Sequence, residues 1–173
     1  MNKGNSAEEE TIRKAAAELL DQLKARGLKI AFAESMTGGL ISGSLARISG
    51  ASSVLLGSVV TYTEDLKHKL LGVPQKFIQE FGAESEEVTR AMSKGLFKLI
   101  PETDVVLAIT GAASASVNEY QISSPVGRVY VCFGTAGRLI SREASFEGSR
   151  QDVLNKAVIF AFEALLDYFE ENK

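Results

Sequence analysis

The chain has 173 residues, of which 45% are hydrophobic and 24% charged, and its formal net charge is −3. These values are typical of one globular domain, which we expect to span residues 1–173 with residues 1–6 as a disordered tail. The lack of a basic cluster argues against nucleic-acid and membrane-surface binding, and no apolar run approaches the roughly 18 residues of a membrane span.

The small number of cysteine and histidine residues limits the cellular compartments and the reaction types that are compatible with the sequence. A single cysteine, Cys132, excludes an internal disulfide, and the polar start MNKGNSAEEE is unlike a signal peptide, so we predict a cytoplasmic protein. Cys132 and the single histidine, His68, are too few for a His/Cys metal site. We therefore expect no metal and no cofactor. An enzyme built on this chain would use Ser, Thr, Lys, Tyr or carboxylate side chains.

Apolar periodicity and turn residues predict an alternating order of helices and strands. The expected elements are a helix at 7–26 with Ser6 as its N-cap, a strand at 28–33, a helix at 39–48, a strand within 54–62, helices at 64–72, 75–81 and 85–100, a strand at 104–110, a hairpin of strands at 127–136 and 138–147, and a final helix opened by a Ser149/Asp152 capping box. This order predicts an α/β fold, a three-layer α/β/α sandwich whose mostly parallel sheet includes one antiparallel strand.

Ligands of open α/β sheets bind beyond the carboxyl ends of the strands, and three such ends are polar here. The first is AESMTGG (33–39), in which Glu34, Ser35 and Thr37 precede Gly38 and Gly39. This turn is neither a dinucleotide fingerprint nor a P-loop. It is open to three interpretations: a phosphate cradle, a nucleophile site using Ser35 or Thr37, or a helix cap formed by Thr37.

Other candidates lie elsewhere along the chain. Tyr62 and Thr110 end the second and third strands, and Arg150 opens the last helix as either a surface arginine or an anion-binding one. Ser52 and Lys67 form a possible Ser–Lys pair, in which burial would keep the lysine neutral. Their spacing of fifteen residues is a weak signal by itself.

Several segments together resemble the carboxy-terminal domain of CinA proteins, a family that includes free-standing nicotinamide-nucleotide amidohydrolases. They are AESMTGG, SGASS, VVTYTEDLKHKLLGV, FGAESEEV, AITGAAS, SPVGRVYV and FEGSRQDV, and the resemblance runs from about residue 10 to residue 169. It implies a five-stranded mixed sheet. It also implies metal-independent hydrolysis of the carboxamide of nicotinamide mononucleotide to nicotinate mononucleotide and ammonia.

The resemblance further implies roles for individual residues. It places the catalytic pair on Ser52 and Lys67, and substrate contacts or catalytic support on Tyr62, Thr110 and Arg150. In this scheme Tyr62 or Thr110 donates to the oxyanion, while Arg150 and amides at helix starts hold the phosphate. The turn containing Glu34, Ser35, Thr37, Gly38 and Gly39 becomes a wall of the substrate pocket. The expected ligand is a small phosphorylated nucleotide, and the family habit is a homodimer.

Two features bear on these expectations. The family usually has glycines and then Lys-Pro-Val-Gly after its TGIAGP segment, whereas here Ser114, Ala115 and Ser116 follow and Ser124 replaces the lysine. The 111–125 loop thus keeps open two alternatives: a non-catalytic nucleotide-binding or regulatory relative, and a hydrolase of another small amide.

In addition, nine extended residues at 54–62 would separate Ser52 from Lys67 by roughly 30 Å. We therefore predict a shorter strand at 58–62, turning at Gly57, unless a second subunit completes the pair.

Overall fold

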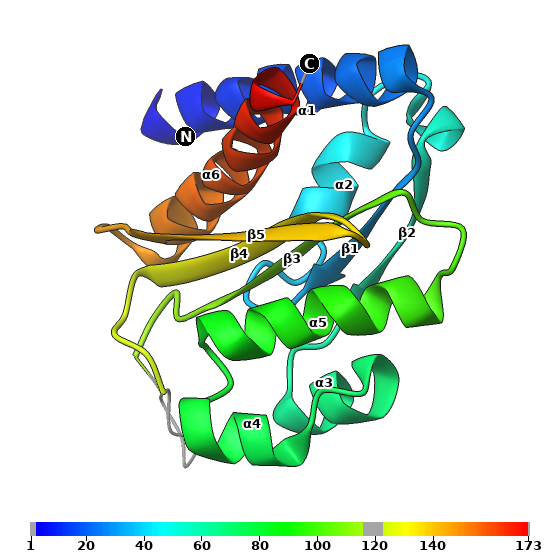
Figure 1. Cartoon of the computed structure of the whole chain (residues 1–173). Helices are drawn as coiled ribbons and strands as arrows, with labels where there is room; N and C mark the ends of the chain where they lie inside the picture. The colour runs from blue at the N-terminus through cyan, green and yellow to red at the C-terminus, as the bar shows by residue number, and fades with distance from the viewer. Residues whose placement is uncertain (1–2, 116–122, 173) are drawn as a thin grey trace.

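The protein is built around one five-stranded sheet, seen edge-on in Figure 1. The computed structural model describes residues 3–115 and 123–172. The strands are β1 (Ile30–Glu34), β2 (Leu55–Val60), β3 (Val105–Gly111), β4 (Arg128–Thr135) and β5 (Arg138–Ser145), in the order β2-β1-β3-β4-β5. Strand β1 pairs in parallel with β2 and β3, while β3–β4 and β4–β5 are antiparallel pairs. Only β4 therefore runs against the others, which confirms the predicted mixed sheet.

Helices cover both faces of this sheet, which confirms the three-layer sandwich (Figure 1). They are α1 (Lys3–Arg26), α2 (Leu40–Ala46), α3 (Glu64–Leu71), α4 (Gln75–Phe81), α5 (Glu86–Leu99) and α6 (Arg150–Glu171), with a short 3-10 helix η1 (Ala51–Ser53) before β2. Helices α1, α2 and α6 pack on one face, and α3, α4 and α5 on the other. Each face has its own hydrophobic core, as expected when an amphipathic helix layer covers each side of a sheet.

Local sequence explains most element boundaries. Strands β1 and β3 are almost wholly buried, because helices lie on both faces of the sheet centre, and their residues form continuous apolar runs. Thr63 and Ser85 cap α3 and α5 by accepting hydrogen bonds from backbone N–H groups three residues later. The predicted capping box of Ser149 and Asp152 is present at the start of α6.

Two boundaries differ from the prediction. Helix α1 begins at Lys3, so Ser6 lies inside the helix instead of capping it, and of the predicted 1–6 tail only residues 1–2 lie outside the described structure. Strand β2 begins at Leu55, so the short strand at 58–62 is wrong, and Gly57 does not reverse the chain. Instead β2 contains a bulge: Leu55 pairs with Ile30, but the next pair joins Gly57 to Ala31.

Candidate functional site

A serine and a lysine meet in a buried position beyond the carboxyl end of β1. Lys67 lies on α3 with 0% of its surface exposed, and its Nζ donates a hydrogen bond to Ser35 Oγ at 3.0 Å. Burial lowers the pKa of Lys67, while the negative charges of Glu84 and Glu64 act in the opposite direction. A lysine with a lowered pKa is neutral more often near neutral pH, so it can accept a proton from the hydroxyl it contacts.

The serine expected to pair with Lys67 lies elsewhere. Ser52 is an exposed residue of η1, at the amino end of β2, whereas Lys67 follows the carboxyl end of that strand. Six extended residues carry the chain about 20 Å, so the strand itself separates the two side chains. Within one chain, the partner of Lys67 is therefore Ser35, which the sequence interpretation had placed in the pocket wall. A Ser52–Lys67 pair would require a second copy of the chain.

The backbone turn that presents Ser35 is held by the carboxylate of Glu34, the last residue of β1, which is 0% exposed. Its two oxygens accept six hydrogen bonds at 2.7–3.1 Å, with Oε2 bound by Thr37 Oγ1, Gly39 N and Ile41 N, and Oε1 by Ser42 N, Ser42 Oγ and Ser58 Oγ. This carboxylate ties the start of α2 to β1 and β2. A buried charge needs this degree of hydrogen bonding to be tolerated.

These contacts change the roles expected for the turn. The prediction that Thr37 caps α2 is wrong, because the cap position is Gly39 and the Thr37 hydroxyl donates to Glu34 instead. The hydrogen-bonding groups of both Glu34 and Thr37 are used inside the protein, so their geometry favours a structural role over direct substrate contact. Gly38 and Gly39 have φ values of 58° and 101°, which side-chain-bearing residues rarely adopt, so the turn requires glycine at both positions.

Three hydroxyl side chains lie in a row across β2, β1 and β3. Beyond the last paired residues the ladder continues: Thr61 N–H donates to Glu34 O at 2.7 Å, and Ser35 N–H donates to a β3 carbonyl at 3.2 Å. This register places Thr61, Ser35 and Thr110 at equivalent positions on neighbouring strands. Residues paired across a parallel sheet project from the same face, here the face covered by α3 and α5.

The hydroxyl of Thr110, expected to contact substrate, already has a partner. Thr89 Oγ1, on α5, lies 2.6 Å from Thr110 Oγ1 and also donates to the backbone oxygen of Ser85 at 2.6 Å. Because that carbonyl can only accept, the Thr89 proton is used there and Thr110 must donate to Thr89. Thr110 therefore keeps lone pairs, but no proton, for a ligand, so it can accept from an amide N–H and cannot stabilise an oxyanion.

A second, exposed group joins two other predicted residues. Arg150 donates from Nη2 to Tyr62 Oη at 3.0 Å and from Nη1 to Ser114 Oγ at 2.8 Å. These side chains come from the start of α6, the end of β2 and the loop after β3, which all meet at the carboxyl edge of the parallel strands. A guanidinium has five N–H donors, so this arrangement leaves donors for an anion.

Two residues near the site were not singled out from the sequence. Glu84, which is 7% exposed, accepts a hydrogen bond from Ser123 N at 3.0 Å and another from Ser123 Oγ, and its charge acts on Lys67. It thereby anchors the chain where it returns from residues 116–122, the part of the 111–125 loop outside the described structure. Glu84 lies in FGAESEEV, one of the segments that carry the family resemblance, so the sequence did contain a signal that could have identified it. Ser114 was noted only as a loop difference.

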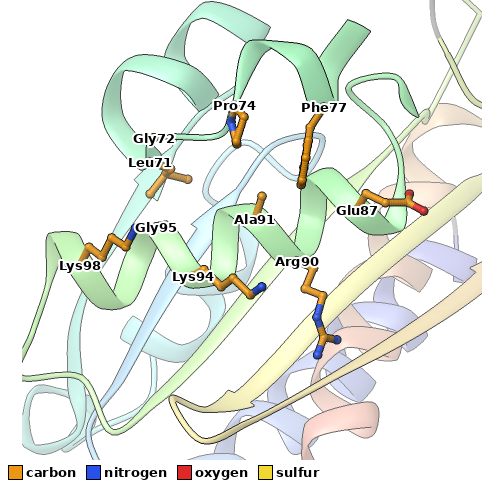
Figure 2. Close-up of a pocket in the computed structure, with 10 residues that line it drawn as sticks. All are labelled: Leu71, Gly72, Pro74, Phe77, Glu87, Arg90, Ala91, Lys94, Gly95 and Lys98. Carbon is orange, nitrogen blue, oxygen red and sulfur yellow. The ribbon is translucent and has the colours of Figure 1, made fainter. Parts of the chain in front are cut away.

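A separate groove of about 340 Å³ lies between α5 and the α3–α4 segment (Figure 2). Leu71, Gly72, Pro74, Phe77, Ala91 and Gly95 contribute apolar surface, while Glu87, Arg90, Lys94 and Lys98 extend from α5. None of the residues predicted for the site lines this groove. Over the described residues, no cluster of three or more His, Cys, Asp or Glu side chains forms a metal site, and no helix is long and apolar enough to span a membrane.

Comparison with known proteins identifies the family to which this chain belongs. The model of the CinA C-terminal domain matches residues 12–169. A CinA-like protein of Petrotoga mobilis is 38% identical over 149 residues, which cover 86% of this chain but only 36% of that protein. The nicotinamide-nucleotide amidohydrolase PncC of Enterobacter agglomerans is 33% identical over 165 residues, covering 95% of this chain and 99% of the relative.

Solved structures of the same superfamily share the fold. A CinA superfamily protein from Klebsiella pneumoniae superposes with a TM-score of 0.85 at 27% identity, covering 92% of this chain and 98% of the other. The competence/damage-inducible protein CihA of Agrobacterium tumefaciens gives a TM-score of 0.83 at 30% identity, covering 91% and 94%. With the family model matching most of its length, the chain belongs to the CinA C-terminal domain family.

Proposed function

We propose that this protein hydrolyses the carboxamide of nicotinamide mononucleotide to nicotinate mononucleotide and ammonia. The observation that carries the chemistry is the buried contact between Ser35 Oγ and Lys67 Nζ, a nucleophile beside a base of lowered pKa. The substrate class is supported by the name of the relative that matches this chain over nearly its full length.

The proposed reaction uses Ser35 and Lys67 in two steps. Ser35 Oγ attacks the carboxamide carbon, and its proton passes to Lys67 Nζ as the carbonyl electron pair moves to oxygen. When the pair returns, the C–N bond breaks and Lys67 protonates the departing nitrogen, which leaves as ammonia. A water molecule then attacks the ester on Ser35, Lys67 accepts its proton, and Ser35 leaves with that proton restored.

We assign the phosphate of the substrate to Arg150. Its guanidinium is exposed, lies at the same edge of the sheet as Ser35, and is oriented by Tyr62 and Ser114. Helix α2 is a poorer phosphate site because Glu34 already accepts the N–H groups at its start. We predict that Arg150→Ala lowers kcat/KM for the mononucleotide by about 10- to 150-fold, the value of a charge-assisted hydrogen bond of about 1.5–3 kcal/mol. Hydrolysis of nicotinamide riboside, which lacks the phosphate, should change little; equal losses on both substrates would contradict the assignment.

The nucleophile is tested by ammonia release from nicotinamide mononucleotide. Ser35→Ala should abolish turnover, whereas Ser52→Ala should retain it if the pair forms within one chain. The opposite outcome would show that Ser52 is the nucleophile. In that case a second subunit must supply it, and mixing inactive Ser52→Ala with inactive Lys67→Ala should restore activity in mixed dimers.

The remaining alternatives follow from the same measurement. Binding of the mononucleotide without ammonia release by the parent would favour the nucleotide-binding or regulatory role. Release of ammonia from a different small amide alone would identify another substrate for the same residues. We further propose a homodimer, which sedimentation or light scattering of the purified protein tests directly.

A further inference from the structure

One hydroxyl group beside Ser35 has no hydrogen-bond partner among the described residues. Thr61 is 0% exposed, yet no described protein group forms a hydrogen bond with its Oγ1. The only other buried side-chain atoms in this condition within residues 3–115 and 123–172 are Thr103 Oγ1 and Ser124 Oγ. Buried hydroxyl groups nearly always have a hydrogen-bond partner, because burying one without a partner lowers the stability of the fold. An unpaired hydroxyl next to a candidate nucleophile is therefore a candidate contact for a ligand.

The register of the sheet fixes where this hydroxyl lies. Thr61 is the β2 neighbour of Ser35, on the same face, as the hydrogen bond from Thr61 N to Glu34 O shows. Hydroxyl side chains at paired positions of neighbouring strands can bond each other, but Thr61 Oγ1 forms no hydrogen bond to Ser35 Oγ. The proton of Thr61 is therefore available to a ligand that binds beside Ser35.

The other hydroxyls near Ser35 are less suited to donate a proton to that carbonyl. Thr110, on the opposite side of Ser35, has its proton committed to Thr89. Tyr62 Oη accepts a hydrogen bond from Arg150 and keeps its proton, but Tyr62 is 51% exposed, so water competes for that proton. Thr61 thus has a free proton in a position shielded from water, where a hydrogen bond to developing negative charge is strongest.

We propose that Thr61 is a catalytic residue whose hydroxyl donates a hydrogen bond to the substrate carbonyl oxygen as Ser35 attacks. This inference rests on the proposed amide hydrolysis at Ser35. No bond to Thr61 forms or breaks: the carbonyl electron pair moves to oxygen, Lys67 takes the Ser35 proton, and Thr61 stabilises the resulting oxyanion. On the other side of Ser35, the lone pairs of Thr110 can accept from the amide nitrogen, so the two threonines would orient opposite ends of the carboxamide.

The test compares activity and stability in one variant. Thr61→Val keeps the shape of the side chain and removes its hydroxyl, so we expect kcat to fall by about 100-fold or more. The midpoint of thermal unfolding should stay unchanged or rise, because an unpaired buried hydroxyl is lost. Thr61→Ser, which keeps the hydroxyl, should retain most of the activity. Thr103→Val is the matched control, since it removes another unpaired buried hydroxyl at the amino end of β3 and should leave kcat unchanged.

A second readout separates this inference from the choice of substrate. A small fluorophosphonate should label Ser35, and the label is observed as a mass increase that is absent from Ser35→Ala. The phosphoryl oxygen of the reagent needs the same hydrogen bond as the substrate carbonyl oxygen, so the labelling rate reports on Thr61. Slower labelling of Thr61→Val supports the role of Thr61 even if nicotinamide mononucleotide proves not to be the substrate. Equal kcat and equal labelling rates in Thr61→Val and the parent would overturn it, as would a parent protein whose Ser35 is not labelled at all.

Discussion

Replacement of Glu34 by glutamine tests how much the site depends on one buried carboxylate. The substitution keeps the size of the side chain and one acceptor oxygen, but turns the other oxygen into a two-proton donor. If the new NH₂ group takes the Oε2 position, it faces two backbone N–H groups, those of Gly39 and Ile41. If it takes the Oε1 position, it faces only one, that of Ser42, because the Ser42 and Ser58 hydroxyls can rotate to accept.

The second orientation of the glutamine amide costs less free energy, so it determines the expected loss of stability. It leaves one buried N–H without an acceptor, at about 1–3 kcal/mol, and weakens the remaining charge-assisted bonds, so we expect a total of about 2–4 kcal/mol. For a chain of this size this corresponds to a fall in Tm of roughly 4–16 °C.

Equilibrium unfolding in urea measures this change directly, with Glu163→Gln as the control. Glu163 is an exposed residue of α6, so its substitution should alter the free energy of unfolding by less than about 0.5 kcal/mol. A Glu34→Gln variant within the same 0.5 kcal/mol of the parent, with an unchanged m-value, would refute the account of Glu34 as the residue that holds the turn.

Two further predictions concern α3, the helix that carries Lys67. Gly95→Ala should destabilise the protein by about 1–3 kcal/mol and reduce activity by displacing α3, because the added Cβ would lie 1.9 Å from Leu71 O. The control is Gly43→Ala, whose new methyl group would lie in open space within α2, so it should be neutral or stabilising by up to about 1 kcal/mol. Urea unfolding measures the stability of both variants. Lys67→Met should lower kcat at least 10²-fold and raise the free energy of unfolding at pH 7, because the folded protein no longer buries an amine. Folding lowers the pKa of Lys67. At a pH between its pKa in the folded protein and its pKa in the unfolded chain, Lys67 is protonated mainly in the unfolded chain, so the stability of the parent rises with pH. The advantage of Lys67→Met should therefore shrink as pH approaches about 10.4, and a constant difference from pH 7 to pH 10 would show that Lys67 is not destabilised by burial.

The fold could be predicted from sequence because its determinants are local. Continuous apolar runs identify the central strands, and caps such as Ser85 and Ser149 fix helix starts within a residue or two. The alternation of these elements then leaves few arrangements besides a layered sandwich. Polar residues at strand ends also indicated the edge of the sheet at which Ser35 and Lys67 meet.

The choice of Ser35 and Lys67 as the proposed reacting groups depended on contacts that sequence spacing does not contain. Ser35 and Lys67 are 32 residues apart and meet only because parallel pairing brings the end of β1 beside the segment that follows β2. The same holds for Thr61, because its lack of a hydrogen-bond partner among residues 3–115 and 123–172 depends on how the folded chain packs. Thr37 looked like a helix cap because hydroxyl residues commonly are, but the buried carboxylate of Glu34, three residues earlier, accepts from the N–H groups at the helix start.

The bulge in β2 decides which side of the sheet receives the end of that strand. Before it, Leu55 packs into the core under α1, α2 and α6; after it, Val59 packs into the core under α3, α4 and α5. The extra residue, Leu56, thus inverts the alternation of every later position in the strand. Deletion of one residue after Gly57 would shift the remaining pairs, turn Thr61 away from Ser35 and bring Tyr62 to its place. Deletion of Leu56 would instead remove the bulge and leave Gly57 opposite Ala31. Within β2, deletion of residue 56 should therefore be tolerated better than a deletion between residues 58 and 60, because only the former keeps Thr61 beside Ser35.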